Sequence, residues 1–237
     1  MPRTRTQPHT EPAEEVLDRY ETGSDGLTNE EADERLAEHG KNDIVSGKRR
    51  SVTRIFVAQF DSVLIWVLVA AAVLSVWTGH TVDAVLITVI VVANGVFGFV
   101  QDYRAERSLE ELRELAAPTA TVLRDSEPTE VEATGVVPGD VLVLESGDVV
   151  PADGRILETT DFEVDEAALT GESMPVSKSP EAVEGGTPVA ERACMVYKGT
   201  SVTRGRAKAV VTSTGMDTEV GGIAEELATT EETNTPL

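Results

Sequence analysis

Two uninterrupted apolar runs dominate the pattern of hydrophobic and polar positions. Residues 62–82 (SVLIWVLVAAAVLSVWTGHTV) contain no Asp, Glu, Lys or Arg, and residues 84–101 form a second uncharged run after Asp83. At about 1.5 Å per residue, each run is close to the roughly 30 Å of a bilayer core. Both are apolar on every face, which favours membrane helices over a pair of buried core helices. We predict two spans, over about 60–79 and 83–101.

Basic residues flank these runs and are absent between them. The turn around Gly79 and His80 has neither Lys nor Arg, whereas the outer flanks carry Lys48, Arg49, Arg50, Arg54, Arg104 and Arg107. Cytoplasmic loops of membrane proteins carry the excess of Lys and Arg. The pattern therefore predicts a multi-pass protein of the cell membrane with both termini in the cytoplasm.

The polar segment before the first run contains two short amphipathic helices. Thr28 and Glu31 have the spacing of a capping box, and Gly40 supplies a stop. The apolar positions of the two predicted helices are Val16, Leu17 and Tyr20, and Ala32, Leu36 and Ala37. These helices fit a small cytoplasmic cap, although a solvated arm is the alternative.

After the second run the period of the pattern changes. Residues 101–116 continue as a charged helix until Pro118 ends it. The segments TATVLR, VLVLES, RILETT, CMVYKGTSV and RAKAVVTST then alternate or run in β-branched residues, separated by Gly-containing turns. We predict a mostly β domain in which residues 151–154 (PADG) form a tight turn without chemistry, followed by a helix in DTEVGGIAEELATT.

The composition of the chain argues against nucleic-acid binding. The formal net charge is -22, and only five of the twenty basic residues are Lys. Nucleic acid is a poor partner, because its binding requires clustered Lys and Arg. Dispersed acids with few lysines fit a salt-rich cytoplasm, which is a hypothesis about habitat. Cys194 is the sole cysteine, so no internal disulfide is expected, and we interpret it as either a small core residue or a residue of the domain surface.

Cofactor and leader motifs are also missing from the sequence. The chain has neither the phosphate-binding motif GxxxxGK[ST] nor a GxGxxG after a strand. Its three histidines are far apart in sequence, which argues against a transition-metal site. The first residues include no apolar region, so we expect no signal peptide.

The stretch LTGESMPVSK presents the strongest candidate chemistry. Thr170, Gly171, Glu172 and Ser173 place two hydroxyls and a carboxylate around a flexible backbone position. Such a loop can offer a carboxylate to a site elsewhere. Taken alone, these four residues are equally compatible with an ordinary polar turn.

The order of motifs along the chain resembles a known family. Four segments resemble, in their order, the first two membrane helices and actuator domain of P-type ATPases, in the branch of the calcium pumps: QDYRAERSLEELRELAAPTATVLRD, VVPGDVLVLESGDVVPADGRIL, VDEAALTGESMPVSK and VYKGTSVTRGRAKAVVTSTGMDTEVGGIA. GLTNEEADERLAEHGKND is similar to the amino-terminal cation-ATPase domain. The resemblance implies a multi-domain α+β membrane protein: a helical cation-ATPase domain at 1–54, a transmembrane hairpin at 55–103, and a mostly-β, distorted jelly-roll-like actuator domain at 104–237.

The resemblance also implies roles for the site residues. In this family a separate domain carries an aspartyl phosphate, and the Glu of the TGES loop orients the water that hydrolyses it. On this chain that residue is Glu172, with Thr170, Gly171 and Ser173 shaping the loop. No cofactor or metal is expected on the chain alone, whereas ATP and Mg²⁺ are expected for the complete pump.

The chain departs from the family where catalysis begins. The phosphorylation motif Asp-Lys-Thr-Gly is absent, as are the nucleotide-binding domain and the later membrane helices. We expect the front part of a pump that does not hydrolyse ATP alone and whose partners are those missing domains and the lipid bilayer. A self-standing two-span regulatory module and one half of a split pump are the alternatives. Calcium is the first expectation for the ion, with sodium, potassium, magnesium and protons behind it.

Overall fold

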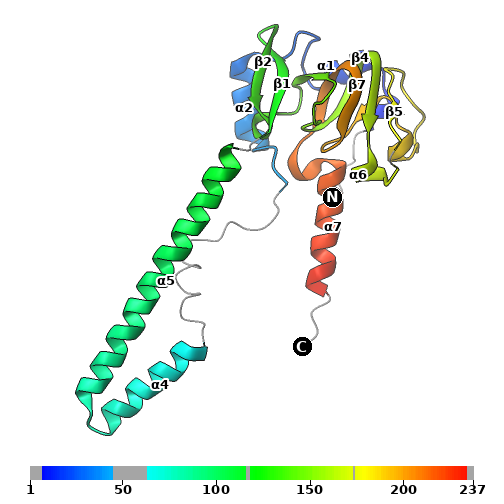
Figure 1. Cartoon of the computed structure of the whole chain (residues 1–237). Helices are drawn as coiled ribbons and strands as arrows, with labels where there is room; N and C mark the ends of the chain where they lie inside the picture. The colour runs from blue at the N-terminus through cyan, green and yellow to red at the C-terminus, as the bar shows by residue number, and fades with distance from the viewer. Residues whose placement is uncertain (1–6, 45–62, 116–117, 173, 234–237) are drawn as a thin grey trace. The chain divides into compact units, whose positions relative to one another are not determined.

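The computed structural model describes residues 7–44, 63–115, 118–172 and 174–233 (Figure 1). They divide into two compact units. One unit combines segments from both ends of the chain, 7–44 and 118–233, and the other consists of 63–115.

The unit at 63–115 consists of two helices. α4 (Val63–Trp77) is followed, after a turn in which Gly79 has φ +84°, by α5 (Thr81–Leu115). Within the described residues, the stretch Thr81–Ala105 of α5 is the one helix long and apolar enough to cross a membrane, whereas α4 is apolar but shorter. The predicted start of the first span lies partly outside the described residues. The charged helix predicted to continue the second run is confirmed, because α5 extends to Leu115.

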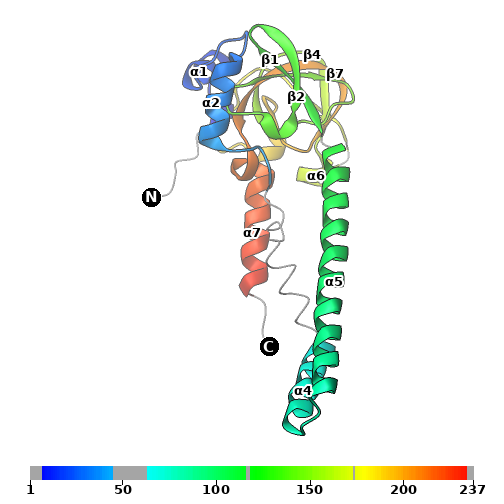
Figure 2. The ribbon, with the colours of Figure 1, turned by 90° about the vertical axis from the view of Figure 1, so that its left-hand side faces the viewer.

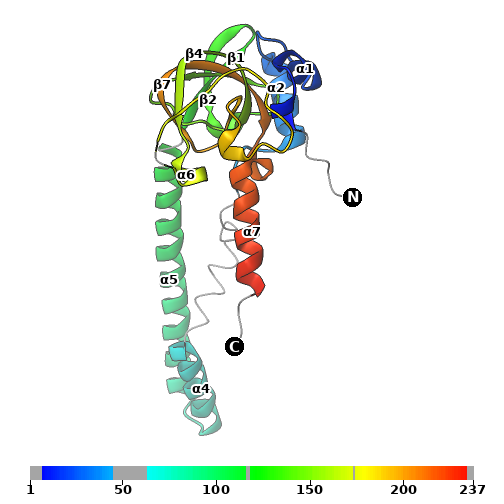
Figure 3. The same cartoon turned by 90° about the vertical axis from the view of Figure 1, so that its right-hand side faces the viewer.

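The second unit is built on an antiparallel β-sheet, as Figures 2 and 3 show from two sides. The order of its hydrogen-bonded neighbours is β2-β1-β3-β7-β4-β5, and β6 pairs with β4. The strands are β1 (Thr119–Arg124), β2 (Glu127–Glu132), β3 (Val141–Glu145), β4 (Asp153–Asp165), β5 (Val176–Ser177), β6 (Met195–Val196) and β7 (Ser201–Ser213). The predicted mostly β domain is therefore confirmed.

The core of this unit contains the buried positions of the long strands. β4 and β7 pair along most of their length, with register shifts where bulges bend them. The main buried cluster is apolar and β-branched in large part: Val122, Val136, Leu142, Leu144, Val150, Ala152, Ile156, Phe162, Val164, Val196, Val202, Ala207, Ala209 and Val211. The short elements α6 (Ala167–Thr170), η2 (Ala133–Gly135), η3 (Val189–Glu191) and η4 (Gly215–Asp217) connect the strands, and α7 (Glu219–Thr233) follows them.

The amino-terminal segment packs against the sheet. It contains η1 (Pro8–Thr10), α1 (Ala13–Arg19) and α2 (Asn29–His39), of which α1 and α2 lie beside the strands in Figure 2. The predicted capping box is present: the Glu31 N–H donates to Thr28 Oγ1 at 3.2 Å, and the Thr28 N–H donates to Glu31 Oε2 at 2.8 Å.

Burial in this segment decides between the cap and the solvated arm. Val16, Leu27 and Ala32 are buried, and Leu27 and Ala32 contact Val137 of the β-domain. The solvated-arm alternative is therefore wrong. Ala37, which was expected on the apolar face of its helix, is exposed.

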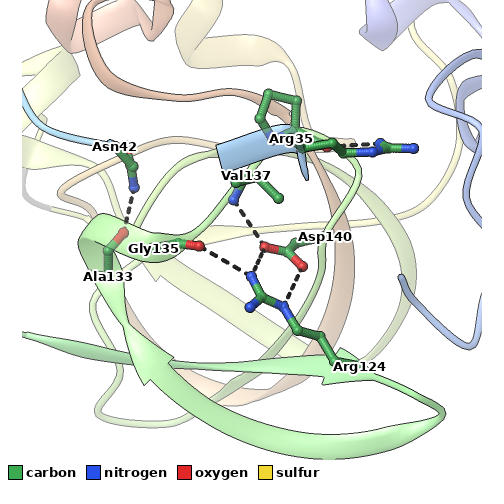
Figure 4. Close-up of polar contacts among 8 residues, drawn as sticks. Arg35, Asn42, Arg124, Ala133, Gly135, Val137 and Asp140 are labelled. Carbon is green, nitrogen blue, oxygen red and sulfur yellow. Dashed lines mark hydrogen bonds and ion pairs between the residues drawn. The ribbon is translucent and has the colours of Figure 1, made fainter. Parts of the chain in front are cut away.

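Polar contacts to backbone carbonyls fix this segment in place (Figure 4). Arg35 Nη1 donates to the carbonyls of Tyr20 and Pro138, at 2.7 and 2.9 Å. The buried side-chain amide of Asn42 donates to the carbonyls of Ala133 and Pro151, at 2.8 and 2.9 Å. Arg35 thus bonds backbone groups of both segments, and Asn42 bonds backbone groups of residues 118–233, so residues 7–44 are a structural part of the β-domain.

Two buried arginines complete the framework. Arg124 donates to both carboxylate oxygens of Asp140, at 3.0 and 2.8 Å, and Figure 4 shows the Asp140 carboxylate also accepting from the Val137 N–H. Arg155, which is fully buried, donates to the carbonyls of Pro8, Glu11 and Pro180. Neither arginine stood out in the sequence.

Candidate functional site: the loop at residues 166–178

The candidate residues lie on a short connection between β4 and β5. α6 makes one helical turn, and the Gly171 N–H donates to the Ala167 carbonyl at 2.9 Å as the turn ends. Gly171 has φ +78°, a left-handed conformation that a residue with a Cβ adopts only with strain. The backbone geometry therefore favours a glycine at this position of LTGES.

Thr170 and Glu172 lie on either side of this glycine. Thr170 Oγ1 donates to the Glu166 carbonyl at 3.1 Å and accepts from the Glu172 N–H at 3.3 Å. Glu172 is exposed, and within the described residues its carboxylate makes no hydrogen bond or ion pair. The next described side chain, Met174, is 79% exposed. The structure thus brings Thr170, Gly171 and Glu172 together at a solvent-facing tip, whereas Ser173 lies outside the described residues.

The two ends of the loop meet in a buried ion pair that sequence analysis missed. Glu166 precedes α6, Lys178 follows β5, and Lys178 Nζ lies 2.5 Å from Glu166 Oε1 with both side chains almost fully buried. The ammonium also lies 5.7 Å from the centre of the Tyr197 ring. Burial raises the pKa of Glu166 and lowers the pKa of Lys178, while the attraction between them opposes both shifts.

Asp153 and Gly154 were expected in a tight structural turn, and that prediction is wrong, because both belong to β4. Asp153 is the first residue of β4 and is buried. Its carboxylate accepts hydrogen bonds from the N–H of Lys198 at 2.9 Å and the N–H of Glu219 at 2.7 Å. Glu219 is the first residue of α7, so Asp153 caps that helix from the sheet. Burial raises the pKa of Asp153 to about 6. The role is structural, as expected for PADG, but the residue links two elements.

A polar cavity of about 300 Å³ lies away from the loop. Its lining includes His9, Asp153, Arg192, Tyr197 and Glu219, and Glu172 does not contribute to it. Cys194 is buried beside this region, where its Sγ donates to the His9 carbonyl at 3.4 Å, which confirms its interpretation as a core residue. The Glu172 carboxylate is therefore exposed to solvent and lies outside this cavity.

Comparison with known proteins assigns these parts. Residues 114–228 match the P-type ATPase actuator domain, and residues 8–75 match the Cation transporter/ATPase N-terminus. Three similar proteins illustrate the range. A calcium-transporting ATPase of Bacillus subtilis is 42% identical over 90% of this chain and 24% of its own length. Calcium-transporting ATPase 1 of Lactococcus lactis is 36% identical over 98% of this chain and 26% of its own length. The sodium/potassium exporting P-type ATPase cta3 of Schizosaccharomyces pombe is 42% identical over 85% of this chain and 20% of its own length.

The β-domain with its exposed loop is therefore an actuator domain, and the chain belongs to the P-type cation-transporting ATPases. It corresponds to the amino-terminal and actuator regions of such a pump, and it spans about a quarter of the length of the relatives that it matches.

Proposed function

We propose that this chain supplies the dephosphorylating and gating part of an ATP-driven cation pump, with Glu172 as the residue that activates water. The observation that carries this proposal is the placement of Glu172. Its carboxylate is exposed and free of partners among the described residues, and it follows a glycine held in a left-handed conformation. Asp140 and Asp153 of the same domain are, by contrast, buried and accept hydrogen bonds.

The chemistry of a carboxylate fits this task. A general base must come within hydrogen-bond reach of the water that it deprotonates or orients. The bond to be hydrolysed is an aspartyl phosphate on another domain, since the Asp-Lys-Thr-Gly motif is absent from this sequence. The exposed tip at Glu172 and Met174 is the part of the chain that reaches that partner. ATP and Mg²⁺ act on the partner domains of the complete pump.

The unit at 63–115 fits a membrane hairpin. Large apolar side chains are exposed along both helices, with Trp66 at 64%, Trp77 at 86% and Phe97 at 70%. Such exposure is unfavourable in water and ordinary in lipid. We assign α4 and the apolar part of α5 as two spans with both chain termini in the cytoplasm, following the basic flanking residues. Movement of the actuator domain would then act on the membrane through α5 and α7 and switch access to the ion site.

Calcium is the cation that we propose first. The relatives from B. subtilis and L. lactis are named calcium-transporting, whereas the S. pombe relative is named a sodium/potassium exporter. Ion ligands of the calcium-pump branch come mostly from membrane helices beyond this chain, so the choice among cations depends on residues outside it.

A graft tests the function directly. The chain replaces the matching region of the B. subtilis calcium-transporting ATPase, and the phosphoenzyme formed from radiolabelled ATP is followed after a chase. We expect Glu172→Gln to form phosphoenzyme that persists, with decay slowed roughly a hundredfold or more, since removal of a general base costs about that factor. Glu184→Gln, an exposed glutamate on another loop, is the control and should decay normally. Normal decay in Glu172→Gln would exclude Glu172 from the mechanism.

A further inference from the structure

The buried ion pair beneath the candidate loop is not accounted for by stability. Removing two charges from water costs several kcal/mol per ion, and replacing a buried pair with well-packed apolar residues is often neutral or stabilising. The Glu166 and Lys178 side chains are 1% and 0% exposed, and Glu166 Oε2 has no hydrogen-bond donor among the described residues. A pair retained under these conditions calls for a role other than net stabilisation.

The position of the pair points to that role. Glu166 immediately precedes α6 and Lys178 immediately follows β5, so their contact closes the base of the loop that carries Glu172. The Lys178 N–H donates to the Phe162 carbonyl at 3.0 Å, which fixes this end of the loop to β4. The Tyr197 ring lies next to the ammonium, in a cluster with Leu169 of α6.

A continuous chain of contacts joins the ion pair to the catalytic candidate. Lys178 Nζ lies 2.5 Å from Glu166 Oε1. The Glu166 carbonyl accepts from the N–H groups of Leu169 and Thr170, both at 2.9 Å, and from Thr170 Oγ1 at 3.1 Å. Thr170 Oγ1 in turn accepts from the Glu172 N–H at 3.3 Å. The orientation of Glu166 therefore determines the position of Thr170, and Thr170 contacts the backbone of Glu172.

We propose that Glu166 and Lys178 are positioning residues, which hold the tip of the loop so that Glu172 is presented to the phosphorylated partner. The inference rests on the proposed function of Glu172. A misplacement of about 1 Å at a reacting group can cost roughly a hundredfold in rate. Buried ionic groups fix a unique conformation in some proteins, and the 2.5 Å contact between Lys178 Nζ and Glu166 Oε1 places such a pair at the base of this loop.

The first test uses the chain itself. Hydrogen exchange is measured at the amides of Thr170 and Gly171, which donate to the carbonyls of Glu166 and Ala167. Glu166→Gln, Lys178→Met and the double variant should each exchange faster at these amides, by roughly tenfold or more. The matched controls are Glu158→Gln and Lys208→Met, which break an exposed pair between β4 and β7 and should leave the loop unchanged. Unchanged exchange at Thr170 and Gly171 in all three pair variants would overturn the proposal.

The second test separates positioning from folding. In the grafted pump, labelling of the buried thiol of Cys194, which lies in the same cluster as Tyr197, reports the packing of the domain around the pair, and phosphoenzyme decay reports the tip of the loop. The double variant leaves no unpaired buried charge, so we expect it to regain the slow thiol labelling of the wild type. Its phosphoenzyme should still decay roughly tenfold or more slowly, because the neutral pair no longer fixes the loop. If the double variant has wild-type rates of both Cys194 labelling and phosphoenzyme decay, the pair has a structural role only.

Glu172→Gln in the same graft keeps the two proposals distinct. Slow decay in Glu172→Gln together with normal decay in the pair variants would overturn the positioning role alone. Normal decay in Glu172→Gln would overturn the proposed function first.

Discussion

Two kinds of acidic residue occur in the actuator domain, and they differ in almost every physical respect. Asp140 and Asp153 are buried, and both oxygens of each carboxylate accept hydrogen bonds from fixed donors. Glu172 is exposed at the end of a single helical turn, and its carboxylate has no partner among the described residues. The same chemical group is buried and hydrogen-bonded in one region and exposed without such partners in the other.

The difference shows what the proposed role of Glu172 requires of the rest of the domain. A free acid on an exposed loop contributes little to folding, so its chemistry is unconstrained by stability. The framework beneath it must then be fixed by other groups. Here buried acids, buried arginines and the Glu166–Lys178 pair provide that framework. Mutations in the two regions should consequently separate stability from activity.

The largest effect on stability is expected at Asp140. Asp140→Ala leaves the Arg124 guanidinium buried without its carboxylate, and breaking a buried pair in this way costs about 3–5 kcal/mol. Trp66 and Trp77 both lie in the apolar unit, so tryptophan fluorescence does not report this loss. The rate of Cys194 labelling in increasing denaturant does, because that thiol is buried in the actuator domain. Glu158→Ala, in an exposed pair, should cost less than about 1 kcal/mol; an equal loss would contradict the comparison.

A smaller, pH-dependent effect is expected at Asp153. Burial raises its pKa from 3.8 to about 6, so the folded state binds the proton more tightly than the unfolded state. The free energy of unfolding contributed by this group should fall as pH rises between about 3.8 and 6 and be constant above that window. The total change is on the order of 3 kcal/mol.

Comparison with Asp153→Asn isolates this contribution, because the other acids titrate in both proteins. Unfolding is followed by labelling Cys194 with a pyridyl disulfide, which reacts with thiols at acidic pH. A difference between wild type and variant that stays constant from pH 4 to pH 7 would show that Asp153 titrates normally.

The smallest effect on stability is expected at Glu172. Glu172→Gln changes an exposed side chain without partners among the described residues, so the free energy of unfolding should change by less than about 0.5 kcal/mol. The measurement is again the labelling of Cys194 in denaturant. A loss as large as that of Asp140→Ala would show that Glu172 is structural, and the contrast between the two regions would disappear.

Local signals in the sequence predicted the elements well. The Thr28–Glu31 capping box, the charged continuation of α5 and the β-strands after Pro118 each depend on neighbouring residues, and all are present. The exposed loop at Glu172 was also predictable, because its motif is contiguous.

Long-range pairings were not predictable in the same way. Arg155 contacts residues near position 8 and near position 180, and Asp153 contacts residues at 198 and 219. A charged residue in a strand pattern carries no sign of such partners. The sequence signal for the Glu166–Lys178 pair was weak, because it consisted only of a Glu and a Lys on either side of LTGES. The structure shows that the two side chains are buried and in contact.

The interleaved construction of the actuator domain constrains how the chain can thread a bilayer. Residues 7–44 and 118–233 pack into one body although the apolar unit separates them in sequence. Both segments must therefore be on the same side of any membrane, and the stretch between them can cross it only an even number of times. If α5 crosses the membrane, the stretch between the two segments must cross it a second time. The domain can then complete its folding only after residues 118–233 have been synthesised.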